Sequence, residues 1–306
     1  MRSRNTAALT LAFAGALLLA ALQPARAQTA SPAPLIVRHA LAQEQHAKVL
    51  TFEQVVLRLL LDKTVATHGP YQLQATEVVS QNRAFLQLAA GDLDLLSSMT
   101  SKEREAQGLP VRVCLYRGLL GVRLPIALSQ RREQFESVSQ LSQALALHIG
   151  QVADWPDTKV LNDNGWKVER LPRLNTFPEM LKRERIDLFA LGAIEVFPIV
   201  DGLPGLSVLE QWAIAYPSAY YFFVSPQQPA LAERLRRGWD MVLADGSFDA
   251  LFEQWMGPQL ARARLNERRW LILKNPELPA TAPLSDPRLW HPLVRSRLIN
   301  AASPSP

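Results

Sequence analysis

The sequence predicts an α/β protein, because short apolar runs suited to buried strands alternate with helical patterns along most of the chain. Residues 35–38, 93–96 and 148–152 have strand character, and segments with helical spacing of apolar residues flank each of them. Such alternation is typical of mostly parallel sheets flanked by helices. The same order of elements occurs before and after Leu124 and Pro125 without sequence repetition, which indicates two structural units.

The first set of elements leads to a polar stretch at the end of a strand. A helix is predicted over residues 52–62, and a second helix begins after the capping residue Ser80 and stops at Gly91. The strand at 93–96 follows, and then the sequence SSMTSKERE at 97–105. Ligands of open α/β sheets lie beyond the carboxyl ends of strands, so this stretch is either one wall of a binding site or an ordinary surface turn.

The second set of elements repeats this order. Helices are predicted over 137–145, 155–164 and 177–185, and strands over 148–152, 166–170 and 187–191. Two further helices, 230–244 and 247–255, are joined at Gly246, which suits the left-handed conformation that ends a helix. Residues 279–306 are rich in Pro, Ser and Ala without periodicity and are expected to be a loosely ordered C-terminal tail.

The N-terminus has the pattern of a secretory signal peptide. Arg2 and Arg4 precede an apolar run over 8–22, and Ala25-Arg26-Ala27 fits the small-x-small cleavage rule. The run is shorter than the roughly 20 residues that a membrane-spanning helix needs, so an uncleaved anchor is the less favoured alternative. We therefore expect residues 1–27 to be removed and the mature chain to be periplasmic.

Composition argues against several classes of function. The formal net charge of +5 includes three signal-peptide arginines, and no basic stretch is interleaved with aromatic residues, so no nucleic-acid partner is expected. The one cysteine, Cys114, lies in an alternating apolar run over 111–115 and is interpreted as strand filling. The five histidines lack ligand spacing and no phosphate-binding glycine loop occurs, so neither a metal nor a cofactor is predicted.

Catalysis is not expected either. The sequence has neither a G-x-S-x-G nor an H-E-x-x-H motif, and its close carboxylate pairs, such as Asp92 with Asp94 and Asp154 with Asp157, are common in short loops. A periplasmic hydrolase or lyase is therefore the least favoured reading, and we predict that the chain is not an enzyme.

Three segments resemble one protein family. They are DLDLLSSMTSKERE (92–105), LHIGQVADWPDTKVLNDNGWKVERLP (147–172) and LAERLRRGWDMVLADGSFDALFEQWMG (231–257). In this order they are similar to the type II periplasmic solute-binding proteins of extracellular solute-binding family 3, which bind amino acids and similar small polar solutes. The sequences WPDT, NDNGW, YPSAYYFFV and ADGSF resemble more closely a bacterial subgroup whose ligands are not generally known.

The resemblance implies two α/β lobes that close over a solute. Lobe 1 would comprise residues 33–122 and 222–275, and lobe 2 residues 123–221, with crossing segments near 121–124 and 220–224. It also implies a monomer that delivers its small-molecule solute to a membrane permease, as part of an ABC transporter. The alternative is a sensing adaptor that reports ligand binding to a membrane receptor.

The resemblance also implies a set of ligand-binding residues. In the first lobe Arg104 would bind a solute carboxylate in a bidentate arrangement, with Ser97, Ser98 and Thr100 beside it as donors. The spacing before Arg104 is one residue shorter than the family pattern, so a surface ion pair with a neighbouring glutamate, Glu103 or Glu105, is the alternative.

In the second lobe Trp155, Asp157 and Thr158 would line the cleft, with a helix-capping role for Asp157 and packing under the loop for Trp155 as alternatives.

One departure bears on the ligand itself. Gly192 stands where amino-acid binders of this family place an acidic residue for the solute's ammonium group, and Glu195 is either its substitute or a first-turn helix charge. We therefore expect either a ligand that lacks an α-ammonium group or a site that has degenerated. The overall expectation is a small polar or anionic solute. One of Tyr216, Tyr220 and Tyr221 would face the cleft, or all three would pack in the core.

Overall fold

A computed structural model describes residues 33–41, 51–77 and 79–300. The predicted signal peptide lies outside these residues. Within the described part of the chain, no helix combines the length and the apolar character needed to cross a membrane.

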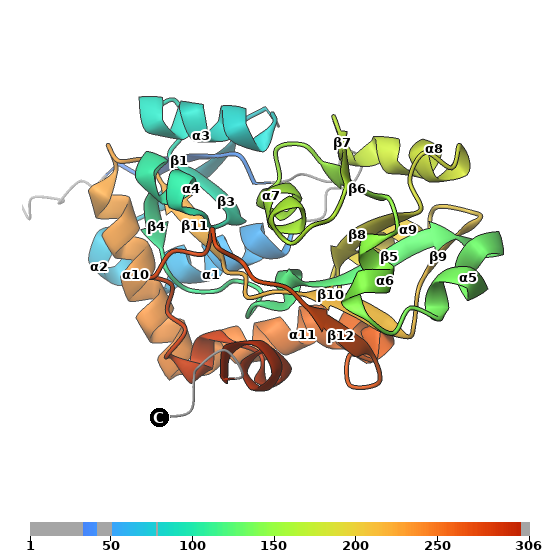
Figure 1. The fold of residues 1–306 in the computed structure, drawn as a ribbon. Coiled ribbons are helices and arrows are strands. Elements are labelled where there is room, and N and C mark those ends of the chain that lie inside the picture. Colours follow the sequence, from blue (N-terminus) through green and yellow to red (C-terminus); the bar gives the residue numbers. More distant parts are fainter. Residues whose placement is uncertain (1–32, 42–50, 78, 301–306) are drawn as a thin grey trace, which may run out of the picture. The chain divides into compact units, whose positions relative to one another are not determined.

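The first of two mixed sheets has the strand order β2-β1-β3-β11-β4 (Figure 1). Its strands are β1 (Leu35–His39), β2 (Tyr71–Ala75), β3 (Leu95–Met99), β4 (Leu109–Val111) and β11 (Tyr220–Val224). The strand β1 pairs in parallel with β2 and β3, whereas β11 runs antiparallel to β3 and β4. The late strand β11 therefore completes a sheet begun near the N-terminus.

We call this sheet together with its flanking helices the first lobe. Local sequence signals define where these helices begin and end. The helices are α1 (Phe52–Lys63), α2 (Val65–His68), α3 (Gln81–Ala90), α4 (Lys102–Gln107) and α10 (Pro229–Ala244). Thr51 and Gln54 form a capping box at α1, and Ser80 caps α3, which ends at the left-handed Gly91. A side chain at Gly238 in α10 would place Cβ 2.7 Å from the Leu60 carbonyl oxygen, so this glycine lets α10 approach α1 closely.

The second sheet has the order β12-β10-β5-β8-β6-β7, with β9 paired to β5. Its strands are β5 (Val122–Leu128), β6 (Ile149–Val152), β7 (Val168–Leu171), β8 (Leu188–Gly192), β9 (Leu206–Val208), β10 (Trp212–Ala215) and β12 (Arg269–Ile272). We call this sheet and its flanking helices the second lobe. The helices are α5 (Arg132–Glu136), α6 (Leu141–Leu145), α7 (Pro156–Asp163), α8 (Phe177–Lys182) and α9 (Val196–Val200).

The predicted fold class, α/β with two lobes and mixed sheets, is confirmed. Parallel and antiparallel pairings occur equally often in the described strands, so neither sheet is mostly parallel. The strand expected over 111–115 is wrong in extent, because β4 ends at Val111 and Cys114 is buried just before a turn. The division of residues between the lobes remains a prediction.

Two segments connect the sheets and touch each other at a glycine. The chain leaves the first sheet after β4 and enters β5 at Val122, passing through the 3₁₀ turn η1 (Leu119–Gly121). It returns through residues 216–219, between β10 and β11, rather than within 220–224. A side chain at Gly121 would meet the Tyr216 carbonyl oxygen at 2.3 Å, so only glycine fits where the two crossings meet.

The C-terminal part connects the sheets a third time (Figure 1). Helix α11 (Ser247–Ala263) leads into β12, which pairs in parallel with β10 at the edge of the second sheet. Residues 273–294, which we call the C-terminal strap, follow β12 and end with α12 (Pro292–Val294). A π-helical turn at Arg295–Ile299 comes next. Trp290 and Val294 are buried against Gly118, so over 279–300 the chain is packed rather than loosely ordered as its composition suggested.

Candidate functional site

Residues of both lobes enclose a pocket of about 240 Å³. From the first lobe and the outward crossing it is lined by Glu53, Gln81, Met99, Tyr116, Leu120 and Tyr220, and from the second lobe by Arg123, Trp155, Pro156, Asp157, Leu174, Leu191 and Glu195. We call this the central pocket. Another pocket, of about 260 Å³, is lined by α9, β9, the end of α11 and the segment after it, and contains none of the predicted site residues.

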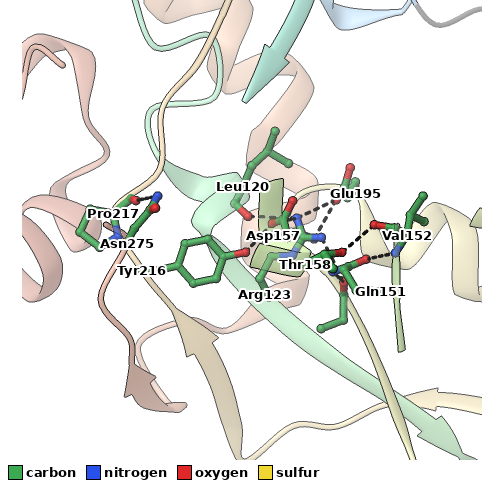
Figure 2. A network of polar contacts seen from close by, with 12 residues as sticks. Leu120, Arg123, Gln151, Val152, Asp157, Thr158, Glu195, Tyr216, Pro217 and Asn275 are labelled. Carbon is green, nitrogen blue, oxygen red and sulfur yellow. Dashed lines mark hydrogen bonds and ion pairs between the residues drawn. The ribbon is translucent and has the colours of Figure 1, made fainter. Parts of the chain in front are cut away.

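Arg123 is the cation of the central pocket, and the protein already occupies most of its donors. It lies on β5 and is 4% exposed. Its Nη1 is 3.2 Å from Asp157 Oδ1 and 3.7 Å from Glu195 Oε1, and its Nη2 donates to the Ala190 carbonyl oxygen at 3.1 Å. Figure 2 shows Asp157 and Glu195 converging on this guanidinium. Burial works to lower the pKa of Arg123, but the facing carboxylates more than offset it and raise that pKa.

Asp157 is fixed from two sides. It lies in the first turn of α7, which begins with Pro156 directly after Trp155, and it is 5% exposed. Its carboxylate accepts a hydrogen bond from the Tyr216 hydroxyl in addition to the contact with Arg123 (Figure 2). Asp157 therefore holds Arg123 in place.

Thr158 fixes the start of α7. Its hydroxyl donates to the Val152 carbonyl oxygen at 2.6 Å, which ties the first turn of the helix to the end of β6. Thr158 is buried, and this hydrogen bond gives its hydroxyl a structural role within the second lobe.

Glu195 and Leu120 together border the space that a side chain at position 192 would need, and Leu120 Cδ2 would lie 2.7 Å from a Cβ there. Glu195 Oε1 accepts a hydrogen bond from the Gly192 backbone N–H at 2.8 Å, and a Cβ on Gly192 would lie 3.1 Å from the same oxygen. The Glu195 side chain remains 37% exposed and lines the central pocket. Partial removal of the carboxyl group from water raises the pKa of Glu195, and Arg123 opposes that rise only in part.

Arg104 links the two lobes. It is 5% exposed, and its Nη1 donates to Ser98 Oγ and to the Met99 carbonyl oxygen. Its Nη2 donates across the cleft to the Asp154 carbonyl oxygen at 3.0 Å. Burial lowers the pKa of Arg104 to about 10, still far above neutral pH, so the guanidinium stays charged.

The predicted alternative for Arg104 was a surface ion pair with Glu103 or Glu105. Among the described residues, Glu105 pairs with Arg112 at 2.5 Å, and Arg104 forms no salt bridge. Arg104 instead lines an adjoining pocket of about 400 Å³ together with Trp155 and Thr158.

The predicted hydroxyl residues separate into two groups. Ser97 and Ser98 line a pocket of about 160 Å³ that shares Glu53, Gln81 and Tyr220 with the central pocket. The Thr100 hydroxyl donates to Glu105 Oε1 at 2.9 Å and lines none of the pockets described above.

The three candidate tyrosines have different positions. Tyr220 lines the central pocket, Tyr216 lies behind Asp157, and Tyr221 is buried in the core.

Most of the residues that line the central pocket were not predicted, and among them are the ionisable residues Glu53, Tyr116 and Arg123. Arg123 had a visible signal, since it is a lone charge inside the apolar stretch GLLGVRLPIAL. Glu53 resembles an ordinary first-turn helix charge, and Tyr116 lies in a connection whose path the sequence does not define. Within the described residues, no group of three or more His, Cys, Asp or Glu side chains is arranged to hold a metal ion.

Solved structures share this fold at low sequence identity. A putative L-cystine ABC transporter protein from Listeria monocytogenes is 16% identical, with a TM-score of 0.53 over 73% of this chain and 96% of that one. A Salmonella typhimurium periplasmic binding protein, described for its high arginine specificity, is 14% identical, with a TM-score of 0.55 over 72% and 99%. The GluR0 ligand-binding core from Nostoc punctiforme, in complex with L-glutamate, is 11% identical, with a TM-score of 0.54 over 74% and 100%.

These structures show that the described chain has the type II periplasmic-binding-protein fold. No family model matches the sequence, and no curated protein matches it.

Proposed function

We propose that this chain is a periplasmic solute-binding protein whose two lobes close over a small polar solute. The observation that carries the proposal is the central pocket, whose wall comes from both lobes, with Gln81 and Tyr116 on one side and Trp155 and Glu195 on the other. A solute that contacts both walls binds the closed arrangement better than the open one and shifts the population toward it.

The wider role follows from the N-terminal pattern and from the fold. We propose export through a cleaved signal peptide over residues 1–27, action as a monomer without catalysis, and delivery of the solute to the permease of an ABC transporter. Two of the structures with this fold, described as an L-cystine ABC transporter protein and as a periplasmic binding protein, support this proposal.

The predicted residues would have different roles in this function. Trp155 would form a wall of the pocket, Asp157 would fix Arg123, and Arg104 would hold the lobes together. Ser97 and Ser98 would contact a part of the solute that extends into the adjoining smaller pocket.

A thermal-shift experiment tests the proposal. The mature chain is screened against amino acids, amines, sugars and organic acids, and at least one compound is expected to raise the melting temperature, because a ligand of the native state stabilises it by mass action. Gln81→Ala and Trp155→Ala, one substitution in each lobe, should both reduce this shift. The exposed Met241→Ala is the matched control.

The proposal fails if no compound stabilises the chain, or if only one of the two lobes contributes to binding. Uptake of the identified solute by cells, with and without this chain, then separates delivery to a permease from reporting to a membrane receptor.

A further inference from the structure

The charges around the central pocket are unbalanced. Among the described residues that line it, one arginine faces three carboxylates, those of Glu53, Asp157 and Glu195. Arg123 lies 3.2 Å from Asp157 and 3.7 Å from Glu195, so its single positive charge offsets one of the three carboxylates. The pocket therefore keeps a formal excess of two negative charges, and its two glutamates come one from each lobe.

The arginines near the cleft offer little to a solute carboxylate. Both terminal nitrogens of Arg104 already donate to protein oxygens, and Arg104 does not line the central pocket. Arg123 donates to the carbonyl oxygens of Leu120 and Ala190, and its remaining Nε is buried rather than presented to the pocket. Neither guanidinium therefore presents to the central pocket the two free N–H groups with which an arginine usually binds a carboxylate.

The rest of the wall suits a cation. Tyr116 and Tyr220 pack edge to face with their ring centroids 5.3 Å apart, and the Trp155 ring lies on the opposite wall. Aromatic rings attract ammonium and guanidinium groups through their faces, most strongly where water is excluded. The Arg123 guanidinium, 5.8 Å from the Trp155 ring centroid, shows that a cation already lies against that ring.

We propose that the central pocket selects a small organic cation without a carboxylate, such as a primary amine or a guanidine, with its charged group between Glu53 and Glu195. This inference rests on the proposed function and specifies its solute class.

The position of the two glutamates also links binding to closure. Glu53 lies in the first turn of α1 in the first lobe, and Glu195 precedes α9 in the second lobe. Their charges repel each other when the lobes close, and a bound cation removes this repulsion. A cation therefore stabilises the closed arrangement more than the open one, as a solute-binding protein requires.

Calorimetry with matched ligand pairs tests the inference. Cadaverine is compared with lysine, and agmatine with arginine, because the members of each pair differ only in the α-carboxylate. Each amine is expected to bind at least about tenfold more tightly than its amino acid. Glu53→Gln and Glu195→Gln should each weaken amine binding by about tenfold or more, whereas the exposed Glu179→Gln should not.

The pH dependence gives an independent readout. Amine affinity should fall as the pH is lowered from neutrality through the raised pKa of Glu195, because the protonated acid no longer attracts a cation. The Glu195→Gln variant should show a weaker pH dependence, because only the Glu53 carboxylate then remains.

The outcomes separate the two proposals. If an amino acid binds as tightly as its amine, or if a neutral or anionic compound binds and amines do not, the solute class is wrong while the proposed function stands. If both Gln variants keep full affinity for amines, the placement between Glu53 and Glu195 is wrong and the inference fails, while the proposed function again stands. If no compound of any class binds, the proposed function fails and the inference fails with it.

Discussion

At the scale of single residues, the best-defined feature is the buried pair of Arg123 and Asp157. The two side chains are 5% and 7% exposed and lie 3.2 Å apart, with Tyr216 completing the hydrogen bonding of the aspartate. A buried ion pair adds little net stability, but removing one member leaves the other charged and unpaired. The pair therefore fixes the wall of the central pocket, and a mutation that removes only one member should lower the free energy of unfolding substantially.

Arg123→Met should lower the free energy of unfolding by about 3–5 kcal/mol, because it leaves the Asp157 carboxylate buried without its cation. Urea denaturation measures the loss. Adding Asp157→Asn should restore part of it, since the second substitution removes the unpaired charge.

The control is Arg262→Met, which breaks an exposed pair with Asp201 and should cost less than about 1 kcal/mol. Equal losses for Arg123→Met and Arg262→Met would contradict the importance of burial at this pair.

Individual site residues were predictable only where a local pattern marked them. Arg104, Trp155 and Asp157 follow strands directly, and the structure brings all three to the cleft. Glu53 lies far from them in the sequence and reaches the central pocket from the start of α1, where the ring of the preceding Phe52 packs 5.3 Å from the Tyr116 ring. A helix of this kind has no sequence signal that separates a pocket-facing glutamate from a solvent-facing one.

At the scale of elements, sequence and structure agree best where the ends of elements have local causes. Ser80 and Gly91 define α3 through side-chain capping and a left-handed turn, as predicted. Strand partners depend on distant residues instead. Residues 269–272 carry no clear strand alternation, and they become β12 because the edge of β10 is open to pairing.

The C-terminal strap makes Gly118 a sensitive position. Gly118 has φ of +79°, and a Cβ there would lie 2.7 Å from the Trp290 ring. Gly246 has φ of +74° with no atom within 4 Å of such a Cβ. Gly246→Ala should cost about 1–2 kcal/mol from backbone strain alone, and Gly118→Ala clearly more, because Trp290 must also move.

Urea denaturation of the two variants tests this comparison. Similar losses would show that the strap does not pack tightly on the crossing segment in solution.

At the scale of the whole molecule, direct contacts between the lobes affect how far the cleft opens. Asp154 accepts from Arg104 through its carbonyl oxygen and from the Gln81 backbone N–H through its carboxylate, at 3.0 and 2.8 Å. One loop of the second lobe thus holds both α3 and α4 of the first lobe. These contacts favour the closed arrangement.

Asp154→Ala should therefore enlarge the radius of gyration of the ligand-free protein, because it removes the carboxylate that joins α3 to the second lobe. Small-angle scattering measures the change, and a saturating ligand should reverse it.

Asp163→Ala, which removes a surface pair with Lys159, serves as the control and should leave the radius unchanged. An unchanged radius for Asp154→Ala would show that this contact does not hold the lobes together.

The edge position of β12 also has a consequence for biosynthesis. The first sheet lacks its fourth strand in spatial order until residues 220–224 have left the ribosome, and the second sheet lacks an edge until residues 269–272 follow. Neither lobe can complete its hydrogen bonding during most of translation. Chains that end before residue 269 would leave one edge of β10 without its partner β12, and such edges invite aggregation. The chain should therefore depend on chaperones until residues 269–272 are available for pairing.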